Sequence, residues 1–476
     1  MNPFEKKPIQ AIHPIDHLNA TTVKAEKWVK RHLALSIVAL ILGVFTMKGV
    51  MGAIQKGTPL SVKQIFIAAV GGGLETDGYG HTNILLLGIG GEGHSGAQLT
   101  DTMIVASLDE AHQSVSMISI PRDLYIESEA VGWGTRINSI YEYVFDKNES
   151  PIEAEAELQK EIENVLGLKI QYYAKIDFQG FTDIVDAIGG ITVEVAQSIN
   201  DDAYPAPDGS TYSYSPFYIA AGTQMLDGTT ALKYVRSRHD SSDFDRAKRQ
   251  QEVITAIKNK ALSLGVLTNG SKIKDIATAI SQNFETNLTI TELLTLVSAS
   301  SDFKDEDIQS AVISDAAYEM GGFLYTPERK EGDPYYLAPY AGDFSEIQKF
   351  AQFFFYHPEI YKNKIPIEVL NGTKANSLAG LTKMVLTRYG FNVVNYGNAT
   401  SKDKVDTKIY QVDPSDDSTE ETLNLLPSLT FGEIVEELPA EYQSATPGTA
   451  KIVIELGQDF WDFYKANEKL FYIGFY

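Results

Sequence analysis

Residues 83–123 of the chain read NILLLGIGGEGHSGAQLTDTMIVASLDEAHQSVSMISIPRD. The stretch holds three short apolar runs, which are Asn83–Leu87, Thr102–Leu108 and Val115–Ile120. Strands that are apolar on both faces are typical of a sheet that helices cover on either side. The stretch therefore predicts three strands of a buried sheet, and it places two charged residues, Arg122 and Asp123, directly after the third strand.

Helical patterns alternate with further strands downstream. Ser150-Pro151 begins a helix with Pro at its first position and Glu153 completing a capping box, and Gly167 ends it. The next expected elements are a strand at 172–176, a helix at 178–188, a strand at 191–195 and a long helix at 243–264. This alternation predicts a layered α/β/α domain over residues 81–300.

A second, smaller α/β module is expected over residues 364–476. IPIEVLNGT begins it with a strand and an Asn-Gly turn, and a helix at 377–388, a strand at 391–396 and the strand KIVIELG follow. Residues 301–363 are rich in aromatic side chains and are interpreted as a connecting segment with one helix at 344–356.

The N-terminal part contains an apolar segment at residues 33–54, which is long enough to cross a bilayer. Lys24, Lys27, Lys30 and Arg31 precede it, and positive charge on that side indicates a cytoplasmic N-terminus. We therefore expect a single-pass protein of the cell membrane, with residues 1–32 in the cytoplasm, a stalk at 55–80 and the remainder outside. A cleavable signal peptide and a buried core helix are the alternatives, although the long N-terminal region and the lack of a polar face disfavour them.

Composition excludes several classes of function. The formal net charge of -23 argues against binding to nucleic acid, which requires a basic surface. The chain has no cysteine, so disulfide scaffolds and cysteine-based zinc or redox sites are excluded. The eight histidines show no HExxH spacing.

Arginines gather in two short stretches despite this negative charge. Arg122 follows a strand, Arg236 and Arg238 would share one face of a strand, and Asp243 begins a helix that carries Arg246, Arg249 and Gln250 on one side. One guanidinium group can donate hydrogen bonds to two phosphate oxygens at once, so the cluster predicts a bound phosphate or pyrophosphate. Surface salt bridges, a turn at Arg122-Asp123 and a simple N-cap at Asp243 are the alternative interpretations.

The loop between the first two strands matches GxGxxG at residues 88–93. A dinucleotide site is excluded, because a polar turn and a strand follow the loop, whereas such a site needs the N-terminus of a helix. Asp101 stands between two threonines at the edge of the second strand and has the carboxylate that Mg²⁺ prefers. An Asx turn would explain the same aspartate.

The order and spacing of these residues resemble the LytR-CpsA-Psr family of bacterial envelope proteins over about residues 83–260. The matching segments are NILLLG, TDTMI, SIPRDLYI, RIN at 136–138, YYAKIDFQGFTDIVDAIGGITVEV, GTQMLDGTTALKYVRSR and DFDRAKRQ. The tail resembles the LytR C-terminal domain. The resemblance implies a mixed central sheet between helices and a hydrophobic channel for a polyisoprenyl phosphate lipid.

The resemblance also implies a phosphotransferase that moves a glycopolymer from a polyprenyl-pyrophosphate carrier onto peptidoglycan. It assigns Arg122, Arg236, Arg238 and Gln250 to the pyrophosphate, and we expect Arg136, Arg246 and Arg249 to bind the same group. It assigns catalytic roles to Asp243, Arg122 and Asp123, and it places Mg²⁺ or Mn²⁺ at Asp101. Gly90 stands where the family usually has a metal-binding aspartate, and Glu92 is the nearest carboxylate that would replace it.

Two other functions remain open at this point. The chain would also suit a membrane-tethered protein that binds polyprenyl lipid or wall polymer without turnover, or a polyprenyl-pyrophosphate hydrolase that uses water as the acceptor. The sequence does not determine which glycopolymer is moved, what the C-terminal module does or whether the chain forms oligomers.

Overall fold

The fold is described from a computed structural model. It describes residues 73–94, 96–205, 214–237, 243–263, 283–289, 307–332, 334–443 and 450–468, together with residues 292, 295 and 296. The membrane span and the stalk expected at 33–54 and 55–80 lie outside this part, apart from the last residues of the stalk. Among the described residues, no helix is both long and apolar enough to cross a membrane.

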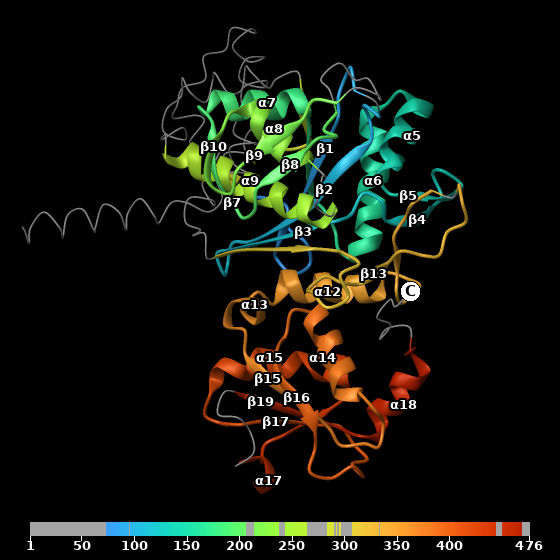
Figure 1. Ribbon diagram of the computed structural model, residues 1–476, viewed down its shortest axis with the longest axis vertical. Helices are drawn as coiled ribbons and strands as arrows, with labels where there is room; N and C mark the ends of the chain where they lie inside the picture. Colours follow the sequence, from blue (N-terminus) through green and yellow to red (C-terminus); the bar gives the residue numbers. More distant parts are fainter. Residues whose placement is uncertain are drawn as a thin grey trace, which may run out of the picture.

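A six-stranded mixed sheet forms the centre of the first lobe (Figure 1). Its order is β11 (Phe284–Thr286), β6 (Tyr172–Asp177), β1 (Thr82–Ile89), β2 (Thr100–Asp109), β3 (Ser114–Ser119) and β12 (Ile308–Val312). Strand β2 runs antiparallel to both of its neighbours, β1 and β3, whereas β6 is parallel to β1 and β12 is parallel to β3. The three strands expected at 83–120 are confirmed as neighbours in the middle of the sheet.

Helices cover both faces of this sheet, as the apolar strands predict (Figure 1). Leu85 and Leu87 of β1 pack in the core beneath α5 (Ser139–Asn148) and α6 (Pro151–Leu166). Ile84 and Leu86 point the other way, into the core beneath α7 (Phe178–Ala187), α8 (Gly228–Arg236) and α9 (Asp243–Ser263). The α/β/α layering is therefore confirmed.

The expected ends of the helix at 151–166 are also confirmed. The Ser150 side chain accepts a hydrogen bond from the backbone N–H of Glu153, and Gly167 ends α6 with a φ of 69°, a conformation that glycine adopts without strain.

The strand expected around Arg236 is wrong. Asp227 caps the backbone N–H of Thr230, and α8 then runs through Arg236. Ala231, Tyr234 and Val235 are buried at the three- and four-residue spacing of a helix facing a core. Arg238 lies outside the described residues.

Two-stranded antiparallel pairs complete the first lobe. They pair β4 (Tyr125–Ser128) with β5 (Trp133–Arg136), β7 (Ile191–Val195) with β10 (Gly222–Leu226), β8 (Ile199–Asp201) with β9 (Phe217–Ile219), and β13 (Leu324–Tyr325) with β14 (Ala338–Pro339).

The second lobe contains a five-stranded sheet. Its order is β16 (Asn392–Asn398), β15 (Pro366–Asn371), β19 (Ile452–Leu456), β17 (Lys408–Gln411) and β18 (Glu433–Val435). The helical segments of this lobe are α14 (Leu378–Arg388), a 3₁₀ turn at Asp417–Thr419, α15 (Glu420–Leu425), α16 (Pro427–Thr430), α17 (Ala440–Gln443) and α18 (Gln458–Ala466).

The described part of the segment at 301–363 contributes to the sheet of the first lobe and to the core that the lobes share. It supplies β12 to the central sheet, and its helix α12 (Ser345–Tyr356) lies between the lobes, followed by α13 (Glu359–Asn363) (Figure 1). Phe350 and Phe354 of α12 belong to one continuous core that extends from β1 to β19.

Candidate functional site

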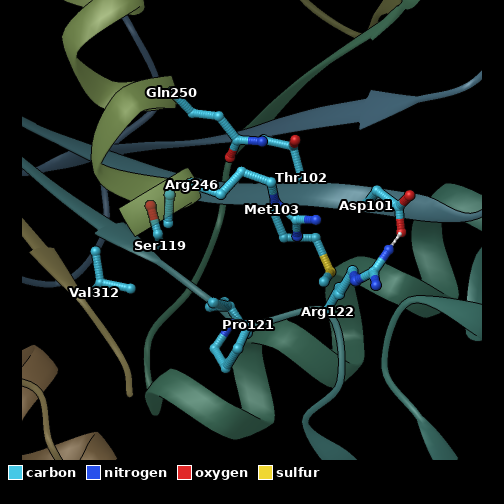
Figure 2. A pocket seen from close by; sticks show the side chains of 11 residues that line it. Asp101, Thr102, Met103, Ser119, Pro121, Arg122, Arg246, Gln250 and Val312 are labelled. Carbon is cyan, nitrogen blue, oxygen red and sulfur yellow. Dashed lines mark hydrogen bonds and ion pairs between the residues drawn. The ribbon is translucent and has the colours of Figure 1, made fainter. Parts of the chain in front are cut away.

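Arg122 and its neighbours form a connected group of charges where β2 begins and β3 ends. Arg122 Nη1 donates to Asp101 Oδ1 at 2.9 Å, and Arg122 Nε lies 3.4 Å from Asp123 Oδ2. Arg136, at the end of β5, donates to Asp123 Oδ1 at 3.0 Å. Figure 2 shows the pair of Arg122 and Asp101 at the edge of a pocket.

Asp123 is the buried member of this group. The Asp123 side chain is only 6% exposed and is held by two guanidinium groups. Asn138 Nδ2 donates to the same Asp101 oxygen that Arg122 binds, at 3.3 Å. Paired guanidinium and carboxylate groups in a partly buried site keep a fixed geometry, so the donors are preorganised for an incoming anion.

A small pocket adjoins Arg122. It is lined by the ends of β2 and β3, by β12 and by one side of α9; the residues are Asp101, Thr102, Met103, Ser119, Ile120, Pro121, Arg122, Arg246, Ala247, Gln250 and Val312. Gln250 and Thr102 point toward one another across its upper part in Figure 2. The pocket therefore brings Arg122, Arg246 and Gln250 together from separate parts of the sequence.

A larger, apolar cavity lies between the sheet and helices α7, α8 and α9. Its volume is about 120 Å³. Its walls are mainly aliphatic and aromatic side chains, including Leu86, Ile104, Phe181, Ile184, Leu232, Val253, Ile257 and Phe284. Thr102 and Gln250 line both the apolar cavity and the small pocket, so the two spaces adjoin.

Arg236 supplies a cation to the apolar cavity. Its guanidinium carbon lies 4.1 Å from the centre of the Phe178 ring, and its Nη1 donates to Tyr204 Oη at 3.3 Å. The residue stands at the last position of α8, where the helix dipole favours a positive charge. Stacking on an aromatic ring holds the guanidinium in place and leaves its edge available to an anion.

Two further polar residues stand beside Arg236. Asp177 lines the cavity and caps α7 by accepting from Gly180 N at 2.8 Å; burial raises its pKa, and the backbone N–H groups of residues 179 and 180 oppose this rise. The His94 ring packs edge-on against Phe178 at 5.0 Å. Burial lowers the pKa of His94 and the charge of Arg236 lowers it further, while Asp177 acts in the opposite direction.

These neighbours, with Phe178 and Tyr204, are absent from the set chosen on the sequence. A histidine in a glycine-rich loop, a helix-capping aspartate and two aromatic residues have no distinguishing spacing. The sequence offers one signal among these residues, the helix-capping position of Asp177, and this signal predicts a helix and not a ligand contact.

Arg249 has a different environment from the other predicted arginines. Its Nε donates to the Tyr234 carbonyl at 3.0 Å and its Nη2 donates to the Ser237 carbonyl, so the guanidinium joins α9 to the end of α8. The side chain is buried, and this burial lowers its pKa. The geometry gives Arg249 a role in packing; its assignment to pyrophosphate stays a prediction.

The other predicted positions are less informative. Glu92 is an exposed residue of the loop after β1, and Gly90 has no side chain to offer. Asp243 begins α9, but its side chain lies outside the described part of the chain. Within the described ranges, no three His, Asp or Glu side chains come close enough together to bind a metal.

An apolar cavity thus adjoins a small pocket that is lined by Arg122 and Arg246. The chain belongs to the LytR-CpsA-Psr family, since the family model matches residues 53–334. A second model, the LytR cell envelope-related transcriptional attenuator, matches residues 364–460.

Two relatives have names that refer to peptidoglycan or to the cell wall. The protein from Bacillus subtilis (strain 168) named polyisoprenyl-teichoic acid–peptidoglycan teichoic acid transferase TagV is 29% identical over 275 residues, which cover 57% of this chain and 63% of that protein. This chain therefore spans less than two thirds of that relative. The cell wall biosynthesis protein LcpA of Corynebacterium glutamicum is 25% identical over 426 residues, which cover 82% of this chain and 76% of that protein.

Among solved structures, the crystal structure of B. subtilis TagV is similar to this chain. The two share 27% sequence identity with a TM-score of 0.44, over 58% of this chain and 97% of the TagV chain.

Proposed function

We propose that this protein transfers a glycopolymer from a polyprenyl-pyrophosphate carrier to peptidoglycan, forming a phosphodiester bond. The observation that carries the proposal is the junction of the two cavities. An apolar space suited to an isoprenoid chain meets a pocket lined by Arg122, Arg246 and Gln250, with Arg236 on the apolar side. The name of the Bacillus relative, a teichoic acid transferase, supports the same reaction class.

The proposed reaction begins when a sugar hydroxyl of peptidoglycan attacks the phosphorus that carries the glycopolymer. The new O–P bond forms as the bond to the lipid phosphate breaks, and polyprenyl monophosphate leaves. Arg122, Arg236 and Arg246 stabilise the charge that collects on the phosphate oxygens, because phosphoryl transfer depends mainly on positioning and electrostatics. Asp243 is the carboxylate we propose to take the proton of the attacking hydroxyl.

The roles of Arg122 and Asp123 follow from their contacts. Asp123 binds Arg122 and Arg136 from a buried position, so it orients both guanidinium groups and offsets part of their charge. Arg122 in turn forms an ion pair with Asp101, and this ion pair lowers the capacity of the Asp101 carboxylate to bind a metal.

The participation of a divalent cation in the reaction is a proposal. If Mg²⁺ or Mn²⁺ takes part, Asp101 would be its ligand, and the cation would neutralise charge on the diphosphate. The described residues do not fit a complete metal site, because Asp101 already binds Arg122 and Asn138, and Glu92 is exposed on its loop. We therefore derive no step through a metal.

The cellular setting is also proposed. The apolar segment at 33–54 would anchor the chain in the bilayer that holds the lipid carrier, with the catalytic lobe outside the cytoplasm.

The decisive experiment is transfer in vitro from a lipid-linked glycopolymer donor to a peptidoglycan oligomer. The wild-type chain should form the linked product and release polyprenyl monophosphate, and Arg122→Ala should lower the rate by about 100-fold or more, the effect typical of losing a preorganised donor to a developing charge. Arg329→Ala is the matched control, because this arginine lies over the Tyr335 ring and outside both cavities. An unchanged rate in Arg122→Ala would remove the role given to that residue.

A second candidate function is binding of the lipid without turnover. The incomplete set of metal-binding side chains around Asp101 favours it. In this case the same assay would detect bound donor but no release of polyprenyl monophosphate. Release without any acceptor would instead indicate a hydrolase.

A further inference from the structure

The loop after β1 brings the His94 side chain against Phe178, one of the residues that line the apolar cavity. The backbone N–H of Gly91 donates to the Ala97 carbonyl at 3.0 Å, and the N–H of His94 donates to the Gly91 carbonyl at 3.3 Å, so the loop folds back on itself. Gly91 passes so close to Asp177 that a Cβ at position 91 would lie 2.8 Å from the Asp177 Cβ. This contact keeps the loop against the wall of the cavity.

The Cβ of His94 lies beside the space into which a side chain at position 90 would extend. A Cβ built on Gly90 would lie 3.2 Å from the His94 Cβ. From there the imidazole reaches Phe178, the same ring on which the Arg236 guanidinium stacks at 4.1 Å. The Phe178 ring thus contacts both an imidazole and a guanidinium, and the charge of Asp177 acts on the imidazole.

We propose that His94 is a headgroup-binding residue of this protein, which donates an imidazole N–H to the diphosphate beside Arg236. This inference rests on the proposed function and adds a donor that the sequence did not indicate.

Binding of farnesyl diphosphate to the full chain, measured by calorimetry, tests this role without relying on turnover. His94→Phe keeps an aromatic ring against Phe178 and removes both ring nitrogens, whereas His94→Gln restores an N–H donor. Loss of one hydrogen bond to a charged group should weaken binding about tenfold or more in His94→Phe, and His94→Gln should recover most of it. Farnesol, which has no phosphate, should bind both variants as it binds the wild type.

His112→Gln is the matched control, because His112 is an exposed histidine on the turn after β2, outside both cavities. If His94→Phe binds farnesyl diphosphate as tightly as the wild type while Arg236→Ala binds it weakly, the role of His94 is refuted and the proposed function stands. If the wild type shows no preference for farnesyl diphosphate over farnesol, the diphosphate site itself is refuted. A loss of farnesol binding in His94→Phe would reduce the residue to a packing role and also overturn the inference.

Discussion

Asp109 is a buried carboxylate that binds two histidines at the end of β2, away from the proposed site. Its Oδ2 lies 3.3 Å from His81 Nε2 and 2.5 Å from His112 Nδ1, and its other oxygen accepts the backbone N–H groups of Ala111 and His112. Burial alone would raise the pKa of Asp109, but the hydrogen bonds from His81 and from the backbone and ring of His112 outweigh it and hold the pKa well below its ordinary value of 3.8.

This depressed pKa makes a prediction about acid stability. The folded protein binds a proton at Asp109 less readily than the unfolded chain, so the ionised carboxylate stabilises the fold above about pH 4, and this contribution is lost as the pH falls further. Asp109→Asn should therefore cost about 1–3 kcal/mol near neutral pH and much less near pH 2. Urea unfolding of both proteins across this range measures the difference, and a constant difference at every pH would contradict the assignment.

The absence of a side chain at Gly228 allows helices α7 and α8 to pack closely together. A Cβ at Gly228 would lie 2.3 Å from the Thr182 carbonyl oxygen and 2.8 Å from the Thr182 Cα, so only glycine permits this approach. Both helices line the apolar cavity, with Phe181 on α7 and Leu232 and Arg236 on α8. The separation of these two helices therefore sets the width of the cavity and the position of Arg236.

Gly228→Ala should push α8 away from α7. We expect a loss of stability of about 1–3 kcal/mol, which is typical of overpacking, together with weaker binding of farnesyl diphosphate. Gly397→Ala is the control, because a Cβ at that position meets no atom within 4 Å. Thermal unfolding and calorimetric binding measure the two effects, and wild-type values for Gly228→Ala in both would show that the helix spacing is not limiting.

One hydrophobic core joins the two lobes through α12. Tyr389, at the end of α14, is fully buried and packs against Phe323 and Phe353 at ring distances of 5.1 and 5.7 Å. Such a shared core makes the lobes one cooperative unit, since neither can unfold without exposing the side chains of the other.

Tyr389→Ala should destabilise both lobes together by about 3–5 kcal/mol. Trp133 lies in the first lobe and Trp461 in the second, so variants that lack Trp28 and retain only one of these two tryptophans report each lobe separately by fluorescence. Both reporters should give the same lowered midpoint of denaturation, while Tyr396→Ala, at an exposed position of β16, should leave it unchanged. Two separate midpoints in Tyr389→Ala would mean that the lobes unfold independently.

Hydrophobic pattern and local capping determined much of this fold in advance. The apolar runs at 83–120 became the middle of the sheet because their side chains enter the two cores on its opposite faces, and Ser150 and Gly167 ended α6 because they satisfy backbone groups locally. The strand expected at Arg236 failed because a short apolar run fits a strand or a buried helix equally well, and only packing against α7 and α9 selected the helix.

The candidate site also combines features that the sequence determines with features that only the tertiary structure determines. The sequence by itself determined which residues are chemically able to bind a phosphate, because a guanidinium keeps its charge and its paired donors in any fold. Only the tertiary structure decided how each one is used: it directed Arg249 to backbone carbonyls, joined Arg122 to Asp101 and Asp123, and brought His94 and Asp177 to Arg236. The physical reason is that side-chain type is a local property, whereas the neighbours of a side chain depend on contacts between segments far apart in the chain.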